Sequence, residues 1–121
     1  MIDKPGQVFS RIHVDDIAGA VLFLINLYSQ GKTPSVVNVA DNLPTNNLEI
    51  IAFAAKIANK SLPSKLPFEI AKKTMSPMAL SFWQENRKVD NSLLCKTLGY
   101  SLIYPDFKSG LKNCYSKLKM N

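Results

Sequence analysis

Two side chains with binding and proton-transfer chemistry, Arg11 and His13, stand close together near the start of the chain. Residues 8–14 alternate as a β-strand does, which places both side chains on the same face. A guanidinium can hold an anionic group through parallel hydrogen bonds, and an imidazole can donate or accept one near neutral pH. We therefore identify both as candidate ligands for a small-molecule substrate. The competing explanation is structural: Arg11 can pair with Asp15 or Asp16, and a histidine at a sheet edge is often only hydrogen-bonded.

A second cationic pair, Arg87 and Lys88, stands at the start of a stretch that is expected to be extended as far as Asp90. These side chains could contact an anionic substrate if the fold brings them to the same cleft. Arg87 can instead form a surface ion pair with Glu85 or Asp90, and such pairs contribute little to stability. The substrate-binding candidates are therefore Arg11, His13, Arg87 and Lys88.

The cysteines, Cys95 and Cys114, are too few for a disulfide scaffold. Each falls where a helix would use a small apolar residue, so we expect two reduced structural thiols. His13 is the only histidine, and no Cys-x-x-Cys pair provides a compact set of soft ligands. The sequence therefore predicts no metal site.

The formal net charge of +6 comes entirely from the second half of the chain. All but two of the 15 cationic side chains are lysines, whereas specific readers of nucleic acids favour arginine. Lys108, Lys112, Lys117 and Lys119 have the spacing of the solvated face of a last helix, whose C-terminal end favours cations. We expect no specific nucleic-acid binding, and a small basic nucleic-acid binder stays an alternative.

The chain of 121 residues is long enough for one domain and too short for a cofactor domain plus a substrate domain. Its longest apolar run, residues 18–25, falls well below the roughly 20 residues of a membrane span. Residues 1–5 are charged and carry no apolar signal region. We expect a cytoplasmic protein without a membrane segment.

Local patterns predict the elements that position the candidate residues. After a strand at residues 8–14, Asp15 and Asp16 are expected to cap a well-buried helix that ends at Gly31. Residues 35–40 form a second predicted strand. Asn46, with a glutamate three positions later, opens a helix to about residue 60.

The second half is predicted to be mostly helical. The prolines of residues 61–67 indicate an extended connector, and an amphipathic turn follows at residues 68–74. Ser76, Asp90 and Asp106 are then suitable N-caps for three further helices. Gly99 suits the left-handed end of the middle one.

These elements predict an α/β protein of a single domain, residues 1–121. Two strands joined by a crossover helix pair well only inside a larger parallel sheet. We therefore expect a partial doubly wound (Rossmann-type) edge of two parallel strands plus a mostly helical C-terminal substrate domain. Residues 8–60 would form the strand-helix-strand-helix piece of the sheet layer, and residues 61–121 the small helical substrate-side subdomain.

The most specific segment is residues 9–18, FSRIHVDDIA. It resembles the strand-to-helix signature of extended short-chain dehydrogenases/reductases, the NAD-dependent epimerase/dehydratase family. Residues 37–41 (VNVAD) look like the next strand of that family, and residues 87–91 (RKVDN) with Tyr104-Pro105 look like its C-terminal end. The resemblance extends over nearly the whole chain. It implies the substrate-binding C-terminal part of such an enzyme, without the N-terminal Rossmann half.

In this family the N-terminal half binds NAD(P) through a glycine-rich turn and uses a Tyr-x-x-x-Lys pair in catalysis. The five glycines here lie too far apart to form that turn. Tyr28 with Lys32 and Tyr115 with Lys119 match the pair, but Gly31 interrupts the first and the second lies in the C-terminal tail. We therefore assign this chain no catalytic residue and no cofactor of its own.

The family's nucleotide-sugar enzymes hold a diphosphate with two arginines, whose places correspond here to Phe9 and to residues 81–84. The resemblance thus leaves the substrate undefined. It implies a truncated or split gene product that is inactive alone, completed by an N-terminal Rossmann partner chain or associating as a homo-oligomer. The alternative is a stand-alone binding or interaction module without catalysis.

Overall fold

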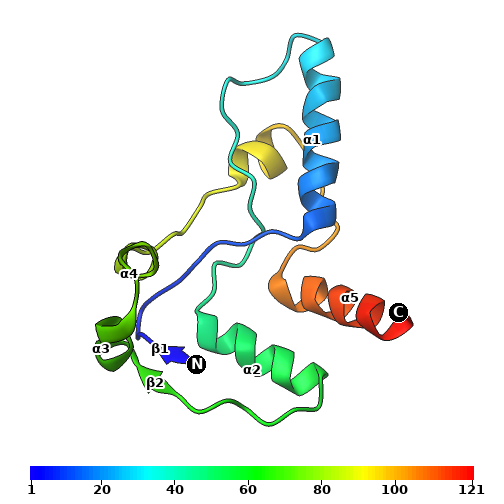
Figure 1. The fold of residues 1–121 in the computed structure, drawn as a ribbon. Coiled ribbons are helices and arrows are strands. Elements are labelled where there is room, and N and C mark those ends of the chain that lie inside the picture. Colours follow the sequence, from blue (N-terminus) through cyan, green and yellow to red (C-terminus); the bar gives the residue numbers. More distant parts are fainter.

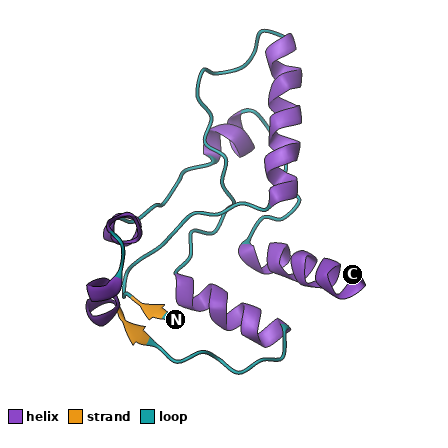
Figure 2. Cartoon of the chain, viewed as in Figure 1, coloured by secondary structure: helices purple, strands orange, loops and turns teal.

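The computed structural model describes all of residues 1–121. In chain order its elements are β1 (Ile2–Asp3), α1 (Val14–Ser29), α2 (Asn47–Ile57), β2 (Leu66–Pro67), α3 (Phe68–Ala71), the 3-10 turn η1 (Lys72–Thr74), α4 (Pro77–Gln84), the π-helical turn η2 (Leu93–Thr97) and α5 (Phe107–Met120). The strands β1 and β2 pair in parallel, with Ile2 opposite Leu66. A mostly helical chain with two parallel strands confirms the predicted α/β class (Figure 2).

The two strands lie outside the segments in which the sequence pattern placed them. Residues 8–14 and 35–40 join no ladder, and only Phe9 forms isolated bridges, antiparallel to Thr45 and parallel to Arg87. Alternation favours an extended backbone, but a ladder also requires a neighbouring strand. The prediction of strands at residues 8–14 and 35–40 is therefore wrong.

The elements separate into two groups that the first part of the chain connects (Figure 1). The short helices α3 and α4 lie beside the small sheet, whereas α1 stands apart with η2 next to it. The helices α2 and α5 contact each other and lie below α1 in Figure 1. Residues 8–13 run from the small sheet to α1, and their backbone forms hydrogen bonds with Asp41, Thr45 and Arg87 on the way.

Side-chain caps explain where four of the helices begin. Asn46 accepts hydrogen bonds from the amides of the first turn of α2, Ser76 caps α4, and Asp106 caps α5, as the sequence predicted. The cap of α1 is His13, whose Nδ1 accepts the amide N–H of Asp15. The predicted capping by Asp15 and Asp16 is wrong, because the helix starts one residue earlier than the aspartates.

Asp16 has a different task, which ties α1 to a distant loop. Its carboxylate is fully buried. Oδ1 accepts hydrogen bonds from the Tyr100 hydroxyl at 2.9 Å and from the Ile103 amide at 2.8 Å, and Oδ2 accepts one from the Tyr104 amide at 2.8 Å. A single side chain therefore holds residues 100–104 against the first turn of α1.

The predicted burial of α1 is wrong. Only Asp16 and Ala20 of this helix are buried, while Leu22 is 69% exposed and Ile25 60% exposed. The apolar residues surround most of the helix, but the chain packs other elements against one side of it only. No helix of the structure is both long and apolar enough to traverse a bilayer.

Candidate substrate-binding site

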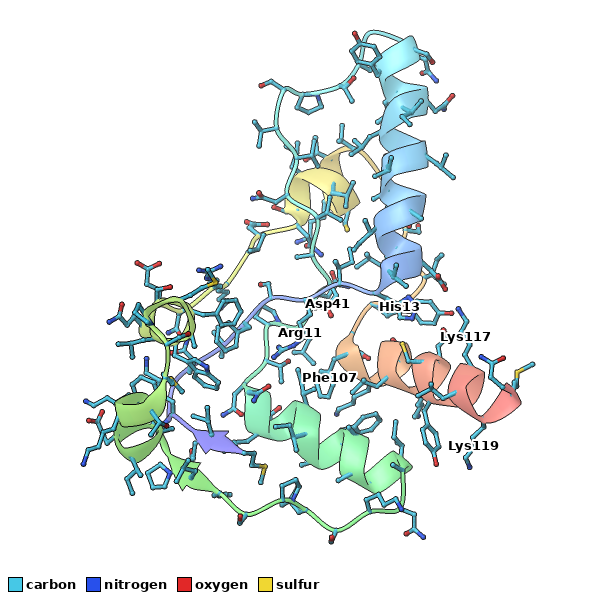
Figure 3. All side chains as sticks on the ribbon, in the orientation of Figure 1. Arg11, His13, Asp41, Phe107, Lys117 and Lys119 are labelled. Atoms are coloured by element: carbon cyan, nitrogen blue, oxygen red, sulfur yellow. The ribbon has the colours of Figure 1, made fainter.

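A cavity of about 260 Å³ lies beside residues 11–14 and is lined in part by α2 and α5. Four of its lining residues, Arg11, His13, Asp41 and Phe107, are labelled near the middle of Figure 3. Its wall combines charged, polar and apolar side chains: Arg11, Ile12, His13, Val14, Asp41, Ile50, Asp106, Phe107, Gly110, Leu111 and Cys114. The structure thus brings together two of the four predicted substrate-binding residues, Arg11 and His13. We refer to this space as the α2–α5 cavity.

Arg11 is half-buried at the cavity wall. Its Nη1 donates hydrogen bonds to the carbonyl oxygens of Phe9, at 3.1 Å, and of Thr45, at 3.0 Å. Burial lowers the pKa of Arg11, and the nearby charge of Asp41 partly offsets that effect. These bonds hold the guanidinium in place, while its remaining N–H groups have no partner in the protein and can meet a ligand.

Asp41 is the main site residue that sequence analysis missed. It was read as part of a turn after the second strand, and it does accept the amide N–H of Leu43 at 3.0 Å. It is also buried, and this burial raises its pKa, against smaller lowering effects of the Leu43 hydrogen bond and of Arg11. The Asp-Asn-Leu-Pro turn carried no signal of burial, so its role in the cavity was not predictable from local pattern.

His13 contributes an enclosed imidazole to the cavity wall. Its side chain is only 5% exposed, and its ring packs against Tyr104 with 4.0 Å between ring centroids. Nδ1 accepts the Asp15 amide at 3.1 Å, and Nε2 lies 3.5 Å from Sγ of Cys114. His13 is therefore a hydrogen-bonded ring, as the structural explanation expected, and it also lines the cavity.

The other two candidates lie away from the cavity. Arg87 is exposed and its guanidinium stacks over the ring of Phe82, 4.8 Å from the centroid. It forms no ion pair with Glu85 or Asp90. Lys88 is exposed and lines another open depression with Asp90, which adjoins the α2–α5 cavity through Asp41. The structure therefore does not bring Arg87 and Lys88 to the side chains of Arg11 and His13.

An aromatic cluster fills the place between these two regions. Phe9 is buried and stacks on Phe82 with 4.9 Å between ring centroids, and the edge of Trp83 meets Phe9 at 5.6 Å. The guanidinium carbon of Arg11 lies over the Phe9 ring, 5.8 Å from its centroid. Aromatic rings therefore occupy the positions at which the sequence resemblance would place a pair of diphosphate-binding arginines. No group of three metal-ligating side chains is present.

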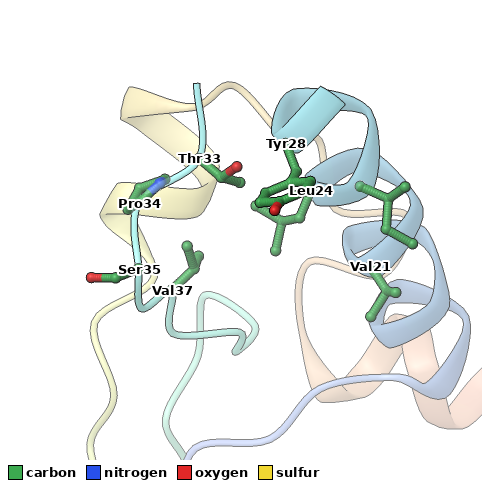
Figure 4. Close-up of a pocket in the computed structure, with 8 residues that line it drawn as sticks. Val21, Leu24, Tyr28, Thr33, Pro34, Ser35 and Val37 are labelled. Carbon is green, nitrogen blue, oxygen red and sulfur yellow. The ribbon is translucent and has the colours of Figure 1, made fainter. Parts of the chain in front are cut away.

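A second, open groove of about 590 Å³ runs between α1 and residues 33–37 (Figure 4). It is lined mainly by apolar side chains: Val21, Leu24, Ile25, Tyr28, Thr33, Pro34, Ser35 and Val37. Residues 33–39 make no backbone hydrogen bond. We call this surface the α1 groove.

Comparisons with known proteins identify structures of the same fold. No family model and no curated protein matches the chain. A solved structure of a functionally unknown conserved protein from Silicibacter pomeroyi is 38% identical, with a TM-score of 0.84 over 98% of this chain. A human epimerase family protein, SDR39U1, solved with NADPH, is 20% identical, with a TM-score of 0.75 over 93% of this chain. The similarity to the human protein is a similarity of fold alone.

This chain spans less than half the length of either protein. It corresponds to 41% of the Silicibacter pomeroyi protein and to 37% of the human one. The fold of this chain is therefore a part of a larger fold that an epimerase family protein also has.

Proposed function

We propose that this chain is the substrate-binding part of an NAD(P)-dependent epimerase/dehydratase-like oxidoreductase and is inactive alone. The observation that carries the proposal is the coverage of a longer protein of the same fold: nearly all of this chain corresponds to only 41% of that protein. The NADPH in the human structure indicates the cofactor chemistry for which the rest of such a fold would be needed. The Cys95 and Cys114 thiols are both free, which fits a reducing, cytoplasmic location.

The exposed surface of α1 supports the proposal. The α1 groove combines apolar side chains, such as Val21 and Ile25, with the unpaired backbone of residues 33–39. Unpaired backbone beside apolar side chains is a surface that pairs with another strand. We infer that a further sheet layer, such as an N-terminal Rossmann part, covers this surface in the complete protein.

The α2–α5 cavity supports the assignment of the substrate side. Arg11 offers free N–H donors, Asp41 offers acceptors, and Ile50 and Phe107 provide apolar wall. Ligand pockets commonly combine an apolar lining with a few fixed polar groups. We propose that a small-molecule substrate binds there through Arg11 and His13. Arg87 and Lys88 would reach it only from the adjacent surface.

The test uses the full chain with the part of the Silicibacter pomeroyi protein that lies outside the matched region, produced separately. We expect the two to associate in sedimentation experiments, and the mixture to bind NADPH in calorimetry while this chain alone does not. Micromolar NADPH affinity of the isolated chain would contradict the proposal.

A pair of matched variants identifies the surface involved. Ile25→Lys places a charge in the α1 groove, and Leu118→Lys places one on α5, at a position that is also exposed and apolar. We expect Ile25→Lys to abolish association and Leu118→Lys to leave it unchanged. Equal behaviour of the two variants would show that the α1 groove is not the surface, and absence of association for the native chain would refute the proposal.

A further inference from the structure

Cys114 opens onto the α2–α5 cavity next to a histidine. It lies on α5, its residue is exposed, and its Sγ is 3.5 Å from Nε2 of His13, which is 101 positions away in the chain. The other thiol, Cys95, is half-buried, and burial raises its pKa. The two cysteines therefore differ in access and in neighbours.

The proton of His13 points to the sulfur. Because Nδ1 accepts the Asp15 amide N–H, the neutral ring carries its own proton on Nε2. Nε2 has no polar partner other than Sγ of Cys114. An N–H aimed at a sulfur stabilises the negative charge that develops there when the thiol loses its proton.

Three contacts fix the ring in that direction. The first is the cap bond to Asp15, and the second is the packing on Tyr104. The third is the close approach of α5 at Gly110, where a Cβ would lie 3.3 Å from Cδ2 of His13. The imidazole is thus held beside the sulfur and cannot turn away without disturbing the start of α1.

The remaining wall around the thiol is largely apolar. Val14, Ile50, Phe107 and Leu111 line the cavity with Cys114. Lys117, one turn along α5, is a cation near the sulfur, and it forms an ion pair with Asp15 at 3.2 Å. A small apolar molecule can therefore enter and meet the sulfur.

We propose that Cys114 and His13 form a thiol–imidazole pair that adds covalently to small apolar α,β-unsaturated carbonyl compounds in the α2–α5 cavity. The sulfur forms a bond to the β carbon and the carbon–carbon π bond breaks. The thiol gives its proton to water, and the α carbon takes up a proton from water, so the S–H adds across the double bond without another reactant. The role of His13 is to position and stabilise the sulfur.

N-ethylmaleimide is a suitable probe, because it contains the same reactive group. The native chain is treated for increasing times, and both cysteines are followed by peptide mass spectrometry. We expect Cys114 to be labelled on the order of tenfold faster than Cys95, because reactivity follows exposure and local charge. Equal rates at the two cysteines would overturn the proposal.

Two variants test the histidine. His13→Asn keeps a cap, since an asparagine side chain accepts the same amide, but it removes Nε2. Gly110→Ala keeps the imidazole but would place a Cβ 3.3 Å from Cδ2 of His13, so the ring has to shift relative to the sulfur. We expect each to slow labelling of Cys114 about fivefold, the effect of losing one hydrogen bond, with labelling of Cys95 unchanged as the internal sign of an intact fold.

Lys117→Gln is the matched control, because it removes the neighbouring charge and leaves the imidazole. We expect it to change the labelling rate of Cys114 less than about twofold, since this ammonium is solvated. The proposal is overturned if both histidine-directed variants leave the rate unchanged, or if Lys117→Gln slows it as much as they do.

Discussion

The buried carboxylate of Asp16 provides the most direct test of how this fold is held together. Asp16→Ala removes the acceptor for the Tyr100 hydroxyl and for the amides of Ile103 and Tyr104. Hydrogen bonds to a charged acceptor contribute about 1.5–3 kcal/mol each, and buried donors without a partner are costly. Water entering the vacated space recovers some of that loss. We therefore expect Asp16→Ala to reduce the free energy of unfolding by about 4 kcal/mol, a large share of the roughly 5–15 kcal/mol of an ordinary domain.

Asp16→Asn separates the hydrogen bonds from the volume of the side chain. Its amide oxygen can keep the two donors that now share Oδ1, but its NH₂ group would face the N–H of Tyr104. We expect a loss of about 2 kcal/mol, the penalty of one unsatisfied buried donor. Asp15→Asn, one position away, is the control: Asp15 is 40% exposed and pairs with a solvated lysine, so only a small change follows.

Urea unfolding followed by circular dichroism measures all three variants. The expected order of stability is native, then Asp15→Asn close to it, then Asp16→Asn, then Asp16→Ala. If Asp16→Ala were as stable as Asp15→Asn, the carboxylate would not be what holds residues 100–104, and the reasoning from buried donors would be refuted.

Four further outcomes follow from the structure. Burial, and after it the Asp16 carboxylate, raises the pKa of Tyr100 from 10.0 to about 12. The contribution of Tyr100 to stability is therefore complete below pH 10 and is lost as the pH rises through about 12. The free energy of unfolding should fall across that window in the native chain and not in Tyr100→Phe. Gly19→Ala should destabilise the chain in thermal melts, although alanine normally favours a helix by about 1 kcal/mol, because its Cβ would overlap the Tyr100 hydroxyl and lie 3.3 Å from Cζ. Tyr100→Phe removes that hydroxyl and should recover part of the loss. The isolated chain should self-associate in light scattering because of the exposed face of α1, and a cooperative, thermostable monomer would contradict this. Duplex DNA should bind weakly and without sequence preference, and a specific footprint that survives moderate salt would exclude that expectation.

Sequence reasoning succeeded where one residue and its immediate neighbours decide the structure. Asn46, Ser76 and Asp106 cap helices as expected, because a cap bond joins a side chain to an amide two or three positions later. Gly99 has a φ of 89°, which explains why the helical turn ends there.

It failed where the deciding partner lies far away in the chain. The pattern of residues 35–40 suits a strand, yet no neighbouring strand pairs with it in this chain. The partners of Asp16 lie 84 to 88 positions away, and Sγ of Cys114 lies 101 positions from His13. No local periodicity encodes such distances.

The sequence predicted some residues of the candidate site correctly and others wrongly. The alternation of residues 8–14 placed Arg11 and His13 together, and both line the α2–α5 cavity. Arg87 was proposed on charge alone, and it lies on another surface, over Phe82. Charge indicates what a side chain could bind, whereas only the fold decides which cavity it reaches.

The dependence of α1 on Tyr104 also has a consequence for how the chain is made. Tyr104 follows Asp16 by 88 residues. At a synthesis rate of roughly 5–20 residues per second, about 4–18 seconds pass before the donors of that buried carboxylate have even been joined to the growing chain. During that interval the first turn of α1 lacks the donors that hold it in the finished fold. Nascent chains stalled before residue 104 should therefore be bound by a ribosome-associated chaperone, and those stalled well beyond it should be released.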